Sequence, residues 1–351
     1  MRALSRAIKA GVMTGAVAAG LAVAAPAAGA ATTATVSTPN IAGAAGTQAG
    51  KVTPLGPIAK VGSGAGGTVS GALKAAAGTA SAAGGQGKAV LNNLLSSGPS
   101  GVKAPYADLT DAGVGLPMWS RSQDTKVPMG SITKVMTAYV VIESGNLGRL
   151  ITVPAGITAY DNKYGGSTAG LKPGEKLTAG QLLYAMLLPS GCDAAYALAS
   201  AYGPGLPGFI AKMNAAAARL GMTNTHFSDF SGLPDPTEYS TYSTARDLVT
   251  LGRAAMSLPL FASIVARPGY RLPAQAGLHP AFNWKTTNPL TGTYAGTAGI
   301  KTGNTEAAGD CLLFEAKRNG RTLIGVVLDE PSFGTAASDA EQMMNWGWKS
   351  I

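Results

Sequence analysis

Apolar residues recur at helical spacing in the segment that follows Pro128. Between Ile132 and Val140 the intervals between them are three, one, three and one, which predicts a helix with one face in a core. Pro128 and a glycine precede this segment, where the chain would enter the helix. Ser131 then lies at the helix N-terminus, and Lys134 lies one turn later on the same face.

Other patterns predict strands at both ends of the folded part and helices between them. Strands are expected at 106–111, 116–120, 296–301, 311–317 and 322–328, and helices at 178–187, 193–198, 209–220, 244–251 and 337–348. A turn at 112–115 joins the first two strands, an Asn-Gly turn at 319–320 joins the last two, and 161–173 reads as a polar loop. The fold class predicted is α/β of the α+β type, an antiparallel sheet with an inserted all-helical lobe.

The first hundred residues differ in composition from the rest. Residues 1–30 have a basic start, an apolar stretch and a small-residue cleavage site, as in a secretory signal peptide; an uncleaved signal anchor is the alternative. Residues 31–103 consist mostly of Ala, Gly, Ser and Thr and contain no aromatic residue. We expect a disordered linker there, because such a segment buries too little apolar surface to fold. Residues 104–351 are then the catalytic domain.

The net charge of +9 belongs to the signal and the linker. Residues 1–103 contain eight of the 27 basic side chains and no acid, which leaves 19 basic and 18 acidic residues for 104–351. The folded part therefore gives no indication of nucleic-acid binding. A cationic segment outside the cell would be attracted to anionic wall polymers or lipid head groups, although a simple soluble spacer fits equally well.

Cysteine and histidine are scarce. Cys192 and Cys311 are the only cysteines, so this is no disulfide scaffold, although a secreted compartment would permit one bridge. His226 and His279 lack the spacing of metal ligands. We therefore expect neither a metal nor a cofactor.

Three short motifs carry the candidate chemistry. Ser131 at a helix N-terminus can act as a nucleophile with Lys134 as its base; the alternative is a capping serine beside a surface lysine. Ser190 follows in a tight turn between two predicted helices, and Lys301 begins a Lys-Thr-Gly sequence in a predicted strand. Singly these could be a turn serine and an edge-strand charge, but together they indicate a cleft between helical lobe and sheet.

These motifs resemble those of the D-alanyl-D-alanine carboxypeptidase family, the low-molecular-weight penicillin-binding proteins. The resemblance covers about 104–351. It also includes residues 171–175, 187–191, 193–195, 213–214, 220–222, 242–247, 288–290 and 299–303. It implies the penicillin-recognising serine-transferase fold, also described as β-lactamase/transpeptidase-like, and an acyl-enzyme on Ser131.

The resemblance assigns roles to the motif residues. Ser131 would attack the carbonyl between two D-alanines, and Lys134 would take its proton once burial and a nearby ammonium on Lys301 keep it neutral. Ser190 would pass that proton to the leaving amine. The backbone N–H groups of Ser131 and Asn304 would form the oxyanion hole.

Four further residues are expected to bind the substrate. Lys301 and Thr302 would hold its terminal carboxylate, and Gly303 would let its backbone approach the strand edge. Cys192 departs from the family pattern, which usually has Asn there, although a branch of actinomycete transpeptidases also carries Cys. A thiol forms weaker hydrogen bonds than an amide, so Cys192 could alter rate and penicillin affinity, or could fill space in the helical lobe.

The function expected is that of a secreted, wall-associated serine-type D-Ala-D-Ala carboxypeptidase acting on peptidoglycan stem peptides, with β-lactams as inhibitors. We expect a monomer without a firm membrane anchor, because the second β-domain and amphipathic tail of many relatives are missing. Alternatives are a transpeptidase that prefers an amine acceptor, or a non-catalytic protein that binds penicillin or wall peptides. A β-lactamase would need Glu175 or Asp161 as base, and a Ser-His-Asp hydrolase would need His226 or His279.

Overall fold

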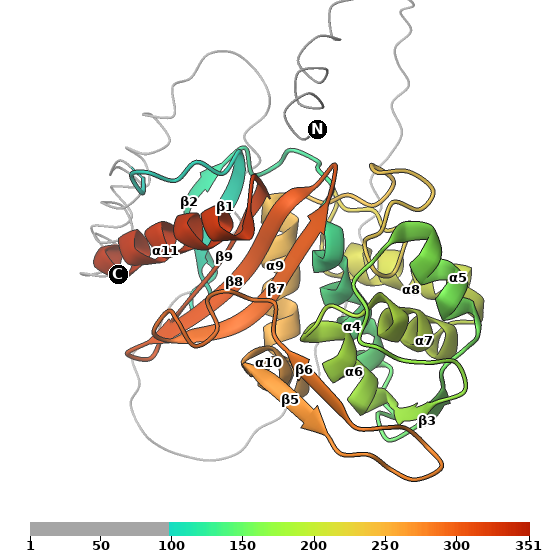
Figure 1. Ribbon diagram of the computed structural model, residues 1–351. Coiled ribbons are helices and arrows are strands. Elements are labelled where there is room, and N and C mark those ends of the chain that lie inside the picture. Colours follow the sequence, from blue (N-terminus) through green and yellow to red (C-terminus); the bar gives the residue numbers. More distant parts are fainter. Residues whose placement is uncertain (1–97) are drawn as a thin grey trace, which may run out of the picture. The chain divides into compact units, whose positions relative to one another are not determined.

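The computed structural model describes residues 98–351, and its largest sheet is a five-stranded antiparallel one. Its strands lie in the order β2-β1-β9-β8-β7 (Figure 1). They are β1 (Tyr106–Asp111), β2 (Leu116–Arg121), β7 (Thr297–Thr305), β8 (Gly309–Arg318) and β9 (Arg321–Glu330). Because β1 pairs with β9, the two ends of the domain share one sheet, and the predicted antiparallel sheet is confirmed.

Local turn chemistry accounts for the β8–β9 hairpin. Asn319 and Gly320 have φ values of 50° and 76°, the left-handed backbone conformation that a two-residue hairpin of this kind requires. Arg318 then pairs with Arg321. Within residues 98–351, β7 pairs with β8 alone, so this strand order places the Lys-Thr-Gly sequence of β7 at the edge of the sheet.

Helices cover both faces of the sheet. Helix α11 (Phe333–Ser350) packs with Phe314 of β8 in one buried cluster. Helix α9 (Ala245–Met256) shares the larger cluster with Leu313, the next residue of β8. Successive residues thus point to opposite faces, as a pleated strand requires, and the sheet is buried between α11 and α9 (Figure 1).

The remaining elements form the helical lobe and two small two-stranded sheets, β3-β4 and β5-β6. They are η1 (Gly130–Ile132), α4 (Thr133–Glu143), β3 (Leu150–Thr152), α5 (Gly156–Tyr164), β4 (Lys176–Thr178), α6 (Ala179–Leu187), α7 (Cys192–Tyr202), α8 (Gly205–Arg219), α10 (Pro259–Val265), β5 (Gly269–Leu272) and β6 (Phe282–Lys285). The expected loop at 161–173 is wrong at its start, because α5 continues to Tyr164 before it ends at Gly165, which has φ 62°. The sequence patterns had not indicated the two small sheets or the helices α5 and α10.

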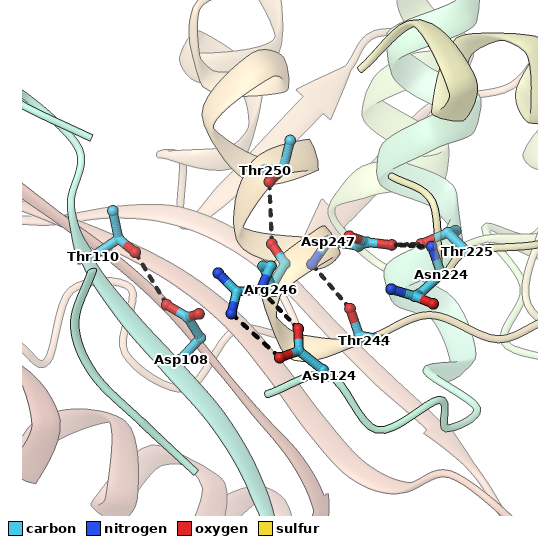
Figure 2. Close-up of polar contacts among 9 residues, drawn as sticks. All are labelled: Asp108, Thr110, Asp124, Asn224, Thr225, Thr244, Arg246, Asp247 and Thr250. Atoms are coloured by element: carbon cyan, nitrogen blue, oxygen red, sulfur yellow. Dashed lines mark hydrogen bonds and ion pairs between the residues drawn. The ribbon is translucent and has the colours of Figure 1, made fainter. Parts of the chain in front are cut away.

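Polar contacts fix the start of α9 (Figure 2). The hydroxyl of Thr244 accepts a hydrogen bond from the Asp247 amide at 3.2 Å. The Asp247 carboxylate in turn accepts from the Asn224 amide at 2.9 Å and the Thr225 hydroxyl at 2.8 Å. Asp247 therefore ties a neighbouring loop to the helix.

Packed contacts begin slightly before residue 104. Val102 is buried in the cluster around α11, and the amides of Lys103 and Ala104 donate to the Asp339 carboxylate. The expected signal peptide and residues 31–97 of the expected linker lie outside the described residues. Among the described residues no single helix is both long and apolar enough to cross a bilayer; α9 and α10 meet that criterion only as a pair, which is bent by 107°.

Candidate active site

Ser131 and Lys134 are brought together at the start of α4. Ser131 lies in the short 3-10 turn η1, and Lys134 lies in the first turn of α4. Lys134 Nζ is 2.7 Å from Ser131 Oγ, which is hydrogen-bond distance for a base and its nucleophile. The predicted pair therefore has the geometry its chemistry needs.

Lys134 is fully buried, and its amine has two further partners. Nζ lies 3.0 Å from the Ser231 carbonyl oxygen and 3.3 Å from Cys192 Sγ. A surface lysine is thus the wrong interpretation of this residue. Cys192 is buried at the start of α7 and contacts the candidate base directly.

Ser190 occupies the break between α6 and α7. Its φ of 67° is unusual for a residue other than glycine, and such strained positions cluster at functional sites. The neighbouring Asp193 is buried and holds the loop opposite, since its carboxylate accepts from the Thr168 hydroxyl at 2.6 Å and the Leu171 amide at 3.0 Å. Asp193 therefore ties residues 168–171 to the start of α7, next to the Ser190 turn.

The Lys-Thr-Gly sequence contributes from β7. Lys301 is buried, and its Nζ donates to the Thr302 carbonyl oxygen at 3.0 Å. Burial, and then the charge of Lys134, lower the pKa of Lys301 well below its usual range. The Thr302 hydroxyl lies 2.6 Å from that of Thr287, a residue that no sequence pattern had pointed to.

Two glycines let β7 approach the Ser131 turn closely. A Cβ at Gly303 would lie 2.2 Å from the Met129 carbonyl oxygen, and one at Gly130 would lie 2.5 Å from the Asn304 amide nitrogen. Gly303 was expected to make room for the substrate. In the structure, the side of Gly303 on which a Cβ would stand faces the backbone of Met129 and Ile132. The close approach brings the Asn304 backbone N–H beside the Ser131 turn, where the predicted oxyanion hole requires it.

These elements surround a cavity of about 420 Å³. It is lined by Ser131, Tyr164, Gly165, Gly166, Ser167, Ser190, Cys192, Leu233, Pro234, Glu238, Thr287, Thr302, Gly303, Asn304, Thr305, Glu306 and Phe333. Most predicted site residues are among them. Lys134 and Lys301 are absent from this lining, so the two lysines lie behind the cavity wall.

The residues that the alternative functions need lie elsewhere. Glu175 accepts a hydrogen bond from the Lys172 amide at 2.9 Å, within its own turn. Asp161 is half-buried, and burial followed by the charge of Asp193 raises its pKa to about 6. Neither carboxylate lines the cavity, and neither do His226 and His279.

The two cysteines are both buried and both free. Cys311 lies on β8, and its thiol donates to the Ala308 carbonyl oxygen at 3.4 Å. Burial raises the pKa of the Cys311 thiol to about 12, so this group is inert. Only Cys192 belongs to the site.

A half-buried serine beside a buried lysine, in a cleft between a helical lobe and the edge of an antiparallel sheet, defines an active-site serine enzyme of the penicillin-binding class. The family model described as D-alanyl-D-alanine carboxypeptidase, peptidase S11, matches residues 95–332. The chain belongs to this family and is a serine DD-peptidase.

Individual relatives agree with this assignment. The chain is 39% identical over 247 residues to the D-alanyl-D-alanine carboxypeptidase of Streptomyces sp. strain K15, covering 67% of this chain and 84% of that protein. It is 36% identical over 243 residues to the carboxypeptidase DacB2 of Mycobacterium tuberculosis, covering 68% and 80%. The crystal structure of the Streptomyces K15 DD-transpeptidase superimposes with a TM-score of 0.69 at 38% identity, covering 72% of this chain and all of that one.

Proposed function

We propose that this DD-peptidase is a secreted, wall-associated carboxypeptidase that removes the terminal D-alanine of peptidoglycan stem peptides through an acyl-enzyme on Ser131. One observation carries the mechanism: the buried Lys134 amine lies 2.7 Å from Ser131 Oγ at the wall of the cavity. Among residues 98–351 no histidine lines that cavity, and of the two carboxylates that do, Glu238 and Glu306, Glu238 accepts a hydrogen bond from the Ala307 amide at 3.2 Å, whereas the Ser131 hydroxyl is paired with Lys134.

Lys134 acts as the base when its amine is neutral. Burial lowers the pKa of Lys301 most, and the charge of Lys134 lowers it further, so the site disfavours two charged amines. Ser131 Oγ then attacks the carbonyl carbon while its proton passes to Lys134 Nζ.

The peptide bond breaks in the second half of acylation. The backbone N–H groups of Ser131 and Asn304 stabilise the negative oxygen of the tetrahedral intermediate, and one such donor contributes about 3 kcal/mol in related chemistry. Ser190 lines the same cavity and relays a proton to the leaving D-alanine amine. Water then attacks the acyl-serine ester and releases the shortened peptide.

Hydroxyl groups make the direct contact with the terminal carboxylate of the substrate. Thr302 and Thr287 both line the cavity, with their hydroxyls 2.6 Å apart. Lys301 lies behind them, and its Nζ is 3.4 Å from Thr302 Oγ1. Its amine therefore reaches the carboxylate only through this hydroxyl pair.

Transfer of the acyl group to an amine is the second candidate reaction. Two observations support transfer as a candidate. The Cys192 thiol lies at the cavity wall beside the base, and one of the similar structures is that of a DD-transpeptidase. Hydrolysis and transfer share every step up to the acyl-enzyme. They differ only in whether water or an amine reaches the ester.

The test is a partition measurement with diacetyl-Lys-D-Ala-D-Ala, in which D-alanine release and peptide products are followed with and without glycylglycine. The proposal expects release without added amine and none from Ser131→Ala. Release only when glycylglycine is present would make the enzyme a transpeptidase. No turnover under either condition, with the protein folded, would overturn the proposed reaction.

Secretion and oligomeric state need their own measurements. We propose that the chain is exported and cleaved near residue 30, and that it acts as a monomer on the wall. N-terminal sequencing of protein recovered from the wall fraction should show a start near residue 31, and sedimentation should give one chain. An intact N-terminus in the cytosol would refute export.

A further inference from the structure

A buried carboxylate that the mechanism above does not use lies behind the candidate base. Asp229 is 1% exposed. Its Oδ1 accepts from the amides of Ser231 at 2.7 Å, Gly232 at 2.6 Å and Leu233 at 3.1 Å, and from the Ser231 hydroxyl at 2.8 Å. Four donors on one oxygen fold residues 229–233 into a tight turn, which we call the Ser231 turn.

The second oxygen of Asp229 is fixed as well. Tyr160 donates its hydroxyl hydrogen to Asp229 Oδ2 at 2.6 Å, and the same hydroxyl lies 2.6 Å from Ser231 Oγ. Burial, and then the charge of Asp229, raise the pKa of Tyr160, so its hydroxyl stays protonated and remains a donor. Both carboxylate oxygens are therefore held, and the orientation of the Ser231 turn follows from them.

The Ser231 turn contacts Lys134 and the backbone that precedes Ser131. The Ser231 carbonyl oxygen accepts from Lys134 Nζ at 3.0 Å. At Gly232, which has φ 87°, an added Cβ would lie 1.9 Å from the Gly130 carbonyl oxygen. The turn is thus packed against the backbone that carries Ser131, and a shift of the turn would move the partner of the base.

The Ser231 carbonyl decides where the lone pair of Lys134 points. A neutral amine has two N–H donors and one lone pair. With its donors on Ser231 O and Cys192 Sγ, the remaining direction is toward Ser131 Oγ, 2.7 Å away. Without the carbonyl at this place, the amine could rotate and donate to Ser131 instead of accepting its proton.

We propose that Asp229 is a positioning residue for acylation, which fixes the Ser231 carbonyl so that the lone pair of Lys134 faces Ser131. The inference rests on the proposed acyl-serine mechanism. It attributes the contribution of Asp229 to the acylation rate to the position of its carboxylate oxygens and not to their charge. Replacement by Asn keeps an acceptor oxygen at the same distance from the backbone, whereas replacement by Glu keeps the charge and moves it by one methylene.

The test measures the binding constant and the acylation rate constant for a fluorescent penicillin separately, together with thermal unfolding. Asp229→Ala and Asp229→Glu should lower the rate constant by on the order of 10²-fold, because a misplacement of about 1 Å has that effect. Their binding constants should stay within about threefold of the wild-type value. Asp229→Asn should retain the rate constant within about fivefold.

Asp247→Ala is the matched control. Asp247 is also a buried carboxylate that holds a loop through a backbone amide and a hydroxyl, at Asn224 and Thr225 (Figure 2). Its loss should lower the unfolding temperature and leave the acylation rate constant near wild type. If Asp229→Ala does not fold, the test rests on the other two variants: the acylation rate constant of Asp229→Asn should exceed that of Asp229→Glu.

Two results would overturn the inference. One is a Glu variant that acylates at the wild-type rate while the Asn variant does not, which would assign the effect to charge. The other is an equal decrease for Asp229→Ala and Asp247→Ala, which would assign it to lost stability. Absence of acylation in the wild-type protein would instead refute the proposed mechanism and would show itself before any variant is compared.

Discussion

Gly303→Ala tests whether the close approach of β7 to the Ser131 turn is needed for the reaction. The added methyl group would lie 2.2 Å from the Met129 carbonyl oxygen and 3.0 Å from the Ile132 amide nitrogen. Carbon and oxygen atoms that are not bonded rarely come closer than about 3.2 Å, so the strand and the turn must separate by about 1 Å. Both neighbours are backbone atoms, which cannot rotate away.

This separation should affect rate more than folding. A displacement of about 1 Å at a reacting centre costs on the order of 10²-fold in rate, and the Asn304 amide would move away from the oxyanion. Overpacking of a buried site costs about 1–3 kcal/mol of stability. We therefore expect Gly303→Ala to fold, with a lower unfolding temperature, and to acylate about 10²-fold more slowly.

The assay is the time course of penicillin acylation by intact mass, combined with thermal unfolding. Gly148→Ala is the control, because a Cβ at exposed Gly148 meets nothing within 4 Å. The control should match the wild-type protein in both measurements. If Gly303→Ala acylates at the wild-type rate, the contact between strand and turn does not position the oxyanion hole, and the reasoning is wrong.

Three further predictions follow from the same structure. Lys134→Ala and Lys134→Arg should both lose most acylation, because arginine stays charged and cannot accept the proton; near-normal mass labelling of the Arg variant would point to another base. Cys192→Asn should change the free energy of penicillin binding by about 1–3 kcal/mol, since one hydrogen bond is at issue. A thiol reagent should label Cys192, and prior acylation by penicillin should protect it. The same reagent should not label Cys311, because burial raises the pKa of that thiol to about 12. Asp108 is buried, and its pKa is raised from 3.8 to about 6, so the folded state binds its proton more tightly than the unfolded state and stability should fall as pH rises between those values. The loss should reach about 3 kcal/mol; equilibrium unfolding of Asp108→Asn should show a flatter pH dependence, and an unchanged profile would refute the assignment.

Sequence patterns predicted the parts of the fold that rest on local rules. The β8–β9 hairpin follows from alternating apolar residues and an Asn-Gly turn, and α6 follows from its periodicity and from Thr178, which caps it together with Gln181. The hairpin β5–β6 was missed because four-residue strands give too short a pattern. It forms because Trp284 packs in the core and donates to the Ala169 carbonyl oxygen at 2.9 Å, a contact 115 residues apart.

The residues of the site likewise divide into those that sequence motifs identify and those that depend on the folded backbone. Ser131, Lys134, Ser190 and the Lys-Thr-Gly sequence carry their chemistry in their side chains, so the motifs identified them. The Ser231 carbonyl could not be found, because every residue type has one. Asp229 gives a weak signal only in retrospect, as an acid before a Ser-Gly turn. Its five accepted hydrogen bonds depend on a backbone path that no pattern predicts.

The most direct test of the central claim is to map the site of acylation by penicillin. The protein is incubated with benzylpenicillin, digested, and analysed by mass spectrometry beside Ser131→Ala. We predict that the adduct lies on the peptide that contains Ser131 and is absent from the variant. An adduct on any other residue, or one that persists in Ser131→Ala, would contradict the claim that Ser131 is the nucleophile.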